Sequence, residues 1–207
     1  MFPISATKIF VFSLCILFIG CKKEDKKNES NGDGTYYYKA TIGGVNYFQD
    51  VTQANDYTAG SGSGGVDDVS LSASINPISS PASNATILEI TKGILHNYYS
   101  STENQFKAFF NPGTYPFTSG PEYDPFQNGN GIYIMWMDKQ GNLWTTMDGT
   151  GNQTGSNFKI ISATDDADPL TYYIRVKMQF NCKLYKEGTG EMMQLTNGEM
   201  VGLFGKI

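Results

Sequence analysis

The sequence is poor in the side chains that most enzymes and metal sites use. Its 207 residues include one histidine, one arginine and three cysteines. Zinc sites and nucleophilic triads combine several His, Cys or acidic side chains, so a single histidine argues against both. The chain also has no nucleophile-elbow, HExxH or P-loop pattern. We therefore expect no enzymatic activity, no metal site and no cofactor.

Basic charge is scarce as well. From Thr35 onward the chain carries 10 basic and 16 acidic side chains, and the net charge of the whole sequence is −5. A nucleic-acid-binding domain needs a basic face that neutralises phosphates. Nucleic acid is therefore not an expected partner.

Long apolar runs are missing except for one near the start. Residues 9–20, IFVFSLCILFIG, form a run that is too short to span a bilayer and is typical of a secretory signal. The run ends in Phe18-Ile19-Gly20-Cys21, which resembles a bacterial lipobox. The resemblance implies that residues 1–20 are a lipoprotein signal peptide and that Cys21 carries a lipid anchor, which makes the membrane a partner. A generic signal with an incidental cysteine is the alternative.

The segment after Cys21 predicts a tether. Residues 21–34, CKKEDKKNESNGDG, have no apolar side chain after the cysteine, so we expect them to be disordered. Within this segment Lys23-Glu24-Asp25 resembles the export signal that places Bacteroidota lipoproteins on the outer surface, and a solvated charge run explains it equally well. The expected location is the outer membrane. The sequence does not distinguish a domain on the cell surface from one that faces the periplasm.

The clearest structural pattern occurs at residues 171–186, TYYIRVKMQFNCKLYK. Every even position from Tyr172 to Leu184 is apolar, and the odd positions are polar or amphipathic. This period of two predicts a β-strand with one buried face, and its length predicts a bend or bulge. Cys182 lies on the buried phase, and it is the one thiol left when the signal leaves and Cys21 is lipidated. We expect an inert thiol and no intramolecular disulfide.

The rest of the chain predicts short strands joined by turns. Residues 49–65 and 118–131 are predicted as loops, and capping residues before Phe106 predict a short helical turn within residues 98–109. The pair Asn197-Gly198, between two extended runs, predicts a hairpin turn. Residues 35–207 are therefore predicted to form a single all-β domain, an antiparallel β-sandwich of about nine or ten strands. A partly closed β-barrel is the alternative.

Three segments carry a resemblance to a known family. YKATIGGVNYF (38–48), GTYPF (113–117), and the ending from MQFNCKLY (178–185) to LTNGEMVGLFGKI (195–207) resemble small uncharacterised Bacteroidota envelope lipoproteins. Those domains pair an N-terminal hairpin with a long penultimate strand and a final hairpin around T-N-G. The resemblance implies an envelope lipoprotein and supplies no catalytic residues.

The candidate binding surface is the loop at residues 118–131 together with the hairpin that follows it. Two aromatic residues beside prolines are predicted to lie at an exposed loop tip, next to two acids. Aromatic faces beside acids suit sugar rings, whose CH faces stack while their hydroxyls form hydrogen bonds. The candidate residues are Glu122, Tyr123, Asp124, Phe126 and Trp144. A core position is the alternative for both tryptophans, and we favour it for Trp136.

Two sets of acids complete the candidates. The densest cluster offers oxygen ligands for Ca²⁺ but lacks the spacing of a calcium loop, so a solvated turn is favoured. Its members are Asp165, Asp166 and Asp168. Three acids in or beside predicted strands are candidates for an acid–base pair. They are Glu89, Asp138 and Asp148.

Together these patterns predict a lipid-anchored, non-enzymatic binding module of the cell envelope. Its expected ligand is a glycan or a partner protein, recognised through the aromatic loops. One alternative is a structural envelope lipoprotein without a small ligand. Another is a glycan hydrolase that uses carboxylates.

Overall fold

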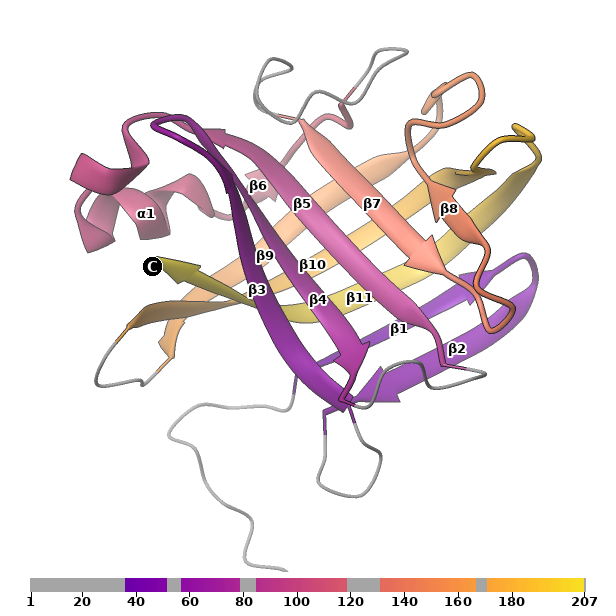
Figure 1. Ribbon diagram of the computed structural model, residues 1–207, viewed down its shortest axis with the longest axis horizontal. Coiled ribbons are helices and arrows are strands. Elements are labelled where there is room, and N and C mark those ends of the chain that lie inside the picture. Colours follow the sequence, from indigo (N-terminus) through magenta and orange to yellow (C-terminus); the bar gives the residue numbers. More distant parts are fainter. Residues whose placement is uncertain (1–35, 52–56, 79–84, 119–130, 167–170, 207) are drawn as a thin grey trace, which may run out of the picture.

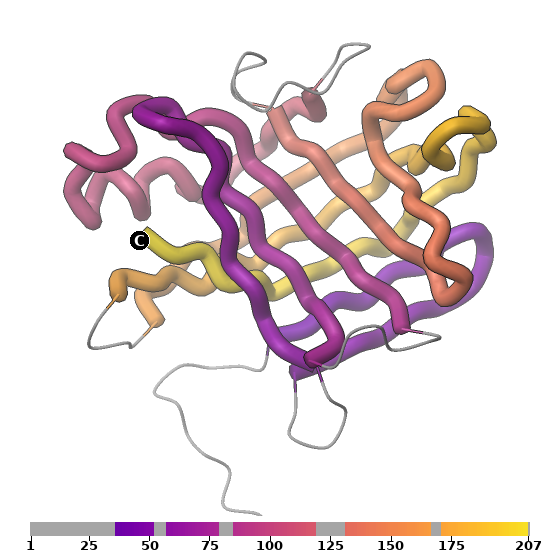
Figure 2. The backbone as a smooth tube through the Cα atoms, in the orientation of Figure 1, coloured from indigo at the N-terminus to yellow at the C-terminus, as the bar shows by residue number. Residues whose placement is uncertain are grey.

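A computed structural model describes residues 36–51, 57–78, 85–118, 131–166 and 171–206 (Figures 1 and 2). This part of the chain contains eleven strands and two short helical segments. The strands are β1 (Tyr37–Ile42), β2 (Val45–Asp50), β3 (Tyr57–Gly65), β4 (Val69–Pro77), β5 (Ile87–Leu95), β6 (Gly113–Thr114), β7 (Ile132–Met137), β8 (Leu143–Thr145), β9 (Asn157–Asp166), β10 (Tyr172–Lys186) and β11 (Met192–Lys206). The helical segments are η1 (Tyr98–Ser100) and α1 (Glu103–Phe109).

The strands form one antiparallel sheet in the order β2-β1-β11-β10-β8-β7-β5-β4-β3, with β9 paired to β10 and β6 paired to β9. The sheet divides at β10, because residues 173–181 pair with β9 while Tyr185 and Lys186 pair with β8. Beyond this junction the sheet curls, so that β3, β4, β5 and β7 cross in front of β9, β10 and β11 (Figure 1). The predicted all-β antiparallel fold is confirmed. Its two packed layers are parts of one sheet that curls into a half-barrel. The fold therefore has the two layers of a sandwich and the partial closure of the barrel named as the alternative.

The long strand β10 follows the predicted alternation. Its buried side chains are Ile174, Val176, Met178, Phe180, Cys182 and Leu184. A straight strand of 15 residues would span about 50 Å, which is longer than most strands of globular proteins. The ladders on either side of β10 each contain a register shift, one between Lys177 and Met178 opposite β9 and one between Phe180 and Cys182 opposite β11. At both shifts the extra residue lies in the partner strand, so the bulge predicted for β10 is found in its neighbours, and a bend of β10 itself stays a prediction.

The hairpin predicted at Asn197-Gly198 is wrong. Strand β11 runs through both residues without a break and pairs with β1 on one side and β10 on the other. The register shifts at this point in both ladders, and Asn197 has a φ of 53°, so the pair forms a β-bulge. Asn and Gly tolerate positive φ, which a bulge uses as readily as a two-residue turn. The hairpin between β10 and β11 lies at residues 187–191, where Gly188 and Gly190 have positive φ.

The loop predicted at residues 49–65 is also wrong in its second half. The Gly- and Ser-rich strand β3 pairs with β4 over nine residues and forms an edge of the sheet. Its lack of side chains permits close approach, because a Cβ atom on Gly60 would lie 2.6 Å from Ser74 Oγ. Ser61 Oγ accepts a hydrogen bond of 2.7 Å from the backbone N–H of Gly205 in β11. This contact brings the edge strand against the opposite layer and fixes the curl.

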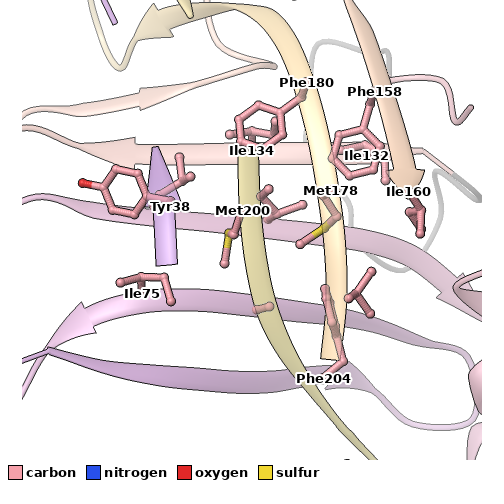
Figure 3. Close-up of a cluster of buried hydrophobic side chains, with 14 of the residues drawn as sticks. Tyr38, Ile75, Ile132, Ile134, Phe158, Ile160, Met178, Phe180, Met200 and Phe204 are labelled. Carbon is pink, nitrogen blue, oxygen red and sulfur yellow. The ribbon is translucent and has the colours of Figure 1, made fainter. Parts of the chain in front are cut away.

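The hydrophobic core fills the space between the two layers (Figure 3). Aliphatic side chains of β4, β5 and β7 meet methionine and aromatic side chains of β9, β10 and β11. The layers approach each other closely at Gly202, where a Cβ atom would lie 2.8 Å from the Cβ of Ala73. This core packs against the inner faces of both layers. Side chains on the outer face of a layer are therefore carried by strands that are packed firmly from the inside.

One end of the core is covered by α1. Its start is fixed by a capping box, in which Thr102 accepts from the backbone of Gln105 and the Gln105 side chain accepts from the backbone of Thr102. Phe106 is fully buried, and Phe110 just after the helix packs on Phe204 with a ring separation of 4.4 Å. The predicted helical turn is thus confirmed. Neither helical segment of the described residues is long and apolar enough to cross a membrane.

Candidate functional site

Most of the loop residues predicted to bind a ligand lie outside the described residues, as do residues 1–34 with Cys21. The loop residues concerned are Glu122, Tyr123, Asp124 and Phe126. Trp144 is 5% exposed on β8, and its indole N–H donates to Asp138 Oδ2 at 3.1 Å. The Lys186 ammonium lies 5.7 Å from the centre of its ring. Trp144 is therefore packed and hydrogen-bonded, and its role in binding stays a prediction. The core position favoured for Trp136 is confirmed, since that side chain is 2% exposed.

The three acids considered for catalysis each have local roles. Asp138 accepts four hydrogen bonds from the turn between β7 and β8, two of them from Asn142 and one from Trp144. Burial raises the pKa of Asp138, but the four hydrogen bonds together hold it below its usual range. Asp148 accepts a hydrogen bond of 2.6 Å from the Thr145 hydroxyl in the turn after β8. Glu89 stands half-buried on β5, and burial raises its pKa.

The acidic cluster considered for calcium is occupied by cations of the protein itself. Lys107 Nζ lies 2.9 Å from Asp165, and the Tyr172 hydroxyl donates to the same carboxylate at 2.7 Å. Hydrogen bonds from Tyr172 and Lys107 lower the pKa of Asp165. Asp166 accepts from Arg175 at 3.3 Å, and Asp168 lies outside the described residues. Within the described residues no group of three or more His, Cys, Asp or Glu side chains is placed to hold a metal ion.

Two other residues that attract attention in the sequence have structural surroundings. Cys182 is a free, buried thiol, as predicted, and burial raises its pKa far above the usual range. A thiol in this state is a poor nucleophile. His96 Nδ1 lies 2.9 Å from Asp68, and both side chains are at least half exposed.

A groove that no sequence pattern predicted lies on the outer face of the layer formed by β1, β11, β10, β9 and β6. The groove has a volume of about 490 Å³. We call it the outer groove. Its lining residues are Lys39, Thr114, Asn157, Phe158, Lys159, Gln179, Phe180, Asn181, Asn197, Gly198 and Glu199.

The polar side chains of the outer groove come mostly from one cross-strand row. In this row Lys39 pairs with Glu199, Glu199 with Gln179, Gln179 with Lys159, and Lys159 with Thr114. Each of the first four is flanked in its strand by buried residues, so its side chain points away from the core. The register therefore brings side chains from five strands into one row.

Glu199 is the fixed centre of the outer groove. Its carboxylate accepts hydrogen bonds from the Tyr37 hydroxyl at 2.6 Å and from Gln179 Nε2 at 3.1 Å. The ammonium groups of Lys39 and Lys177 lie 3.0 and 3.5 Å away. Burial raises the pKa of Glu199, but these donors outweigh it and lower the pKa to about 2. The carboxylate is therefore ionised at neutral pH and holds four neighbouring side chains in place.

The amides at one end of the outer groove are also oriented. Asn181 Nδ2 donates to Asn157 Oδ1 at 3.2 Å, and Asn181 Oδ1 accepts from the backbone N–H of Asn197 at 2.8 Å. The second contact depends on the bulge in β11, because the bulge aims that N–H at the neighbouring strand. The misread Asn197-Gly198 pair is thus part of the candidate site.

Comparisons with protein-family models, with curated proteins and with solved structures find no match to this chain.

Proposed function

We propose that the protein is a non-enzymatic binding module of the cell envelope and that it holds a glycan in the outer groove. The observation that carries the proposal is the lining of the groove, which combines amide, hydroxyl and ammonium groups around one fixed carboxylate. A volume of about 490 Å³ lies within the range of ligand sites. Amides and hydroxyls both donate and accept hydrogen bonds, as the hydroxyl groups of a sugar require.

The chemistry of Glu199 favours binding over hydrolysis. Glycoside hydrolases of the common type place two carboxyl groups at the scissile bond, one of which is protonated near the working pH. Glu199 is the one acid among the described residues that line the outer groove. Its lowered pKa and its four donors suit an anchor for other side chains and do not suit a general acid. These properties of Glu199 support a binding module over the hydrolase alternative.

The envelope location remains part of the proposal. A lipid at Cys21 followed by a tether at residues 21–34 would hold the domain near the outer membrane while leaving its faces free to meet glycans. Binding through the loop at residues 118–131 stays a separate prediction.

The test is a glycan array followed by isothermal titration of the purified protein with the best ligand. Gln179→Ala and Asn181→Ala each remove an amide of the outer groove, and we expect each to weaken binding about ten-fold, the cost of one or two hydrogen bonds. Gln194→Ala removes an exposed amide of β11 that does not line the groove, so it serves as the matched control.

A silent array with a folded protein would contradict the proposal and favour a structural envelope lipoprotein. Binding that survives both groove variants unchanged would also contradict it, because the ligand would then lie elsewhere.

A further inference from the structure

The outer groove is positively charged, although the protein as a whole is acidic. Three lysines, Lys39, Lys159 and Lys177, stand in or beside the groove around the single carboxylate of Glu199. The local excess is therefore two positive charges, against a net charge of −5 for the chain. A concave site with a net charge concentrates ligands of the opposite charge. The excess of positive charge in the outer groove therefore favours anionic ligands.

The three lysines are not equivalent. Lys39 and Lys177 share the charge of Glu199, at 3.0 and 3.5 Å. Lys159 is exposed in the same row, and it takes part in none of the ion pairs formed within the described residues. An exposed ammonium group without a carboxylate partner can bind an anionic ligand without first breaking an ion pair. Lys159 is therefore the natural contact for a negative charge.

An exposed aromatic ring extends the row past the outer groove. Phe48 of β2 pairs with Lys39, so its side chain continues the line of outward residues. It is 64% exposed, and its ring centre lies 6.2 Å from that of Tyr37, whose hydroxyl is bonded to Glu199. Phe48 thus presents an aromatic face that a second, anchored ring supports. Such a face suits the CH groups of a sugar ring.

We propose that the outer groove binds an acidic oligosaccharide. Its carboxylate or sulfate group pairs with Lys159, its hydroxyls bond to Gln179 and Asn181, and a neighbouring sugar ring stacks on Phe48. The row from Phe48 to Thr114 crosses six strands, so it spans about 24 Å at about 4.8 Å between strands. This length suits a chain of several sugars. The inference rests on the proposed function and names the ligand class for the same site.

The test is isothermal titration of the full-length protein with three matched probes at low salt. The probes are a neutral glucose hexasaccharide, an oligogalacturonate of the same length and a sulfated hexasaccharide. We expect the better acidic probe to bind at least ten-fold tighter than the neutral one. Comparison of the two acidic probes shows whether the groove prefers a carboxylate or a sulfate. Titration with inorganic phosphate and sulfate alone is expected to give no comparable binding, because the sugar contacts are then missing.

Two variants locate the contacts. Lys159→Gln should weaken binding of the acidic probe about ten-fold and leave the neutral probe unchanged. Phe48→Ala should weaken both probes by the same factor, because stacking does not depend on charge. Lys183→Gln removes the same charge from β10 at a position outside the outer groove, and it should have little effect on either probe.

The outcomes separate this inference from the proposed function. Equal binding of neutral and acidic probes would overturn the acidic ligand and leave glycan binding in place. An absence of binding by every oligosaccharide would overturn both. Equal losses from Lys159→Gln and Lys183→Gln would show a diffuse charge effect and overturn the specific role of Lys159.

Discussion

Replacing Glu199 by glutamine tests whether the carboxylate organises the outer groove. In the wild-type protein the pKa of Glu199 is lowered from 4.5 to about 2, so the folded state favours the ionised form. A lowering of this size corresponds to about 3 kcal/mol if it is fully expressed. Two of the partners, Lys39 and Lys177, have side chains that are 52% and 38% exposed, and water screens their contribution. We therefore expect Glu199→Gln to lower the free energy of unfolding by about 1–2 kcal/mol at pH 7.

The direction of the pH dependence follows from the same shift. Because the folded pKa lies below the unfolded one, the stabilisation is fully present above pH 4.5 and is lost as the pH falls from 4.5 toward 2. The difference in unfolding free energy between wild type and Glu199→Gln should therefore shrink over this window. Other acids titrate in both proteins alike, so they cancel in the difference.

The assay is urea denaturation followed by tryptophan fluorescence at several pH values between 7 and 2.5. Glu187→Gln, at an exposed position in the hairpin after β10, is the control and should match the wild type at every pH. A variant as stable as the wild type at pH 7, or a difference that does not change with pH, would contradict the role of Glu199 as an ionised anchor.

Three further predictions concern the scaffold. Gly198→Ala places a Cβ atom against the ring of Phe180 and 2.7 Å from its carbonyl oxygen, so it should lower the unfolding free energy by about 1–3 kcal/mol. Gly113→Ala, whose Cβ meets nothing nearer than 3.9 Å, should change little in the same urea titration. Lys92 is 4% exposed, and burial lowers its pKa to about 8, so the unfolded chain binds more protons than the folded one between about pH 8 and 10.5. The unfolding free energy of the wild type should therefore rise with pH in this window relative to that of Lys92→Met. If the two proteins show the same dependence of unfolding free energy on pH, the pKa of Lys92 is not lowered by burial. Cys182 should react with a thiol reagent only on unfolding, and peptide mapping that finds rapid labelling of the folded protein would contradict its burial.

The sequence predicted the strands whose side chains alternate. Strand β10, the hairpin of β7 and β8, and the capped helix α1 appear where periodicity and capping residues place them. Strand β3 was not predicted, because a run of Gly and Ser has no periodic pattern of apolar side chains. Its pairing with β4 depends on backbone hydrogen bonds, which the sequence pattern does not show. The Asn197-Gly198 bulge escaped because the same two residues fit a turn, and the choice depends on whether the ladders continue on both sides.

The outer groove could not be derived from one strand at a time. Alternation in β10 is enough to place Gln179 and Asn181 on the outer face. The neighbours that complete the site, Lys39, Lys159 and Glu199, come from three other strands. Their alignment depends on register, which bulges in β9 and β11 shift by single residues. The loop residues predicted from aromatic composition, among them Tyr123 and Phe126, lie outside the described residues.

The central claim is that a glycan lies across the outer row of β1, β11, β10 and β9. The most direct measurement is the change in backbone amide chemical shifts when the acidic oligosaccharide is added to the isotopically labelled protein. We expect the largest changes to fall on Lys39, Lys159, Gln179, Asn181 and Glu199. Changes confined to the opposite layer of β3, β4 and β5, or to the loop at residues 118–131, would contradict it.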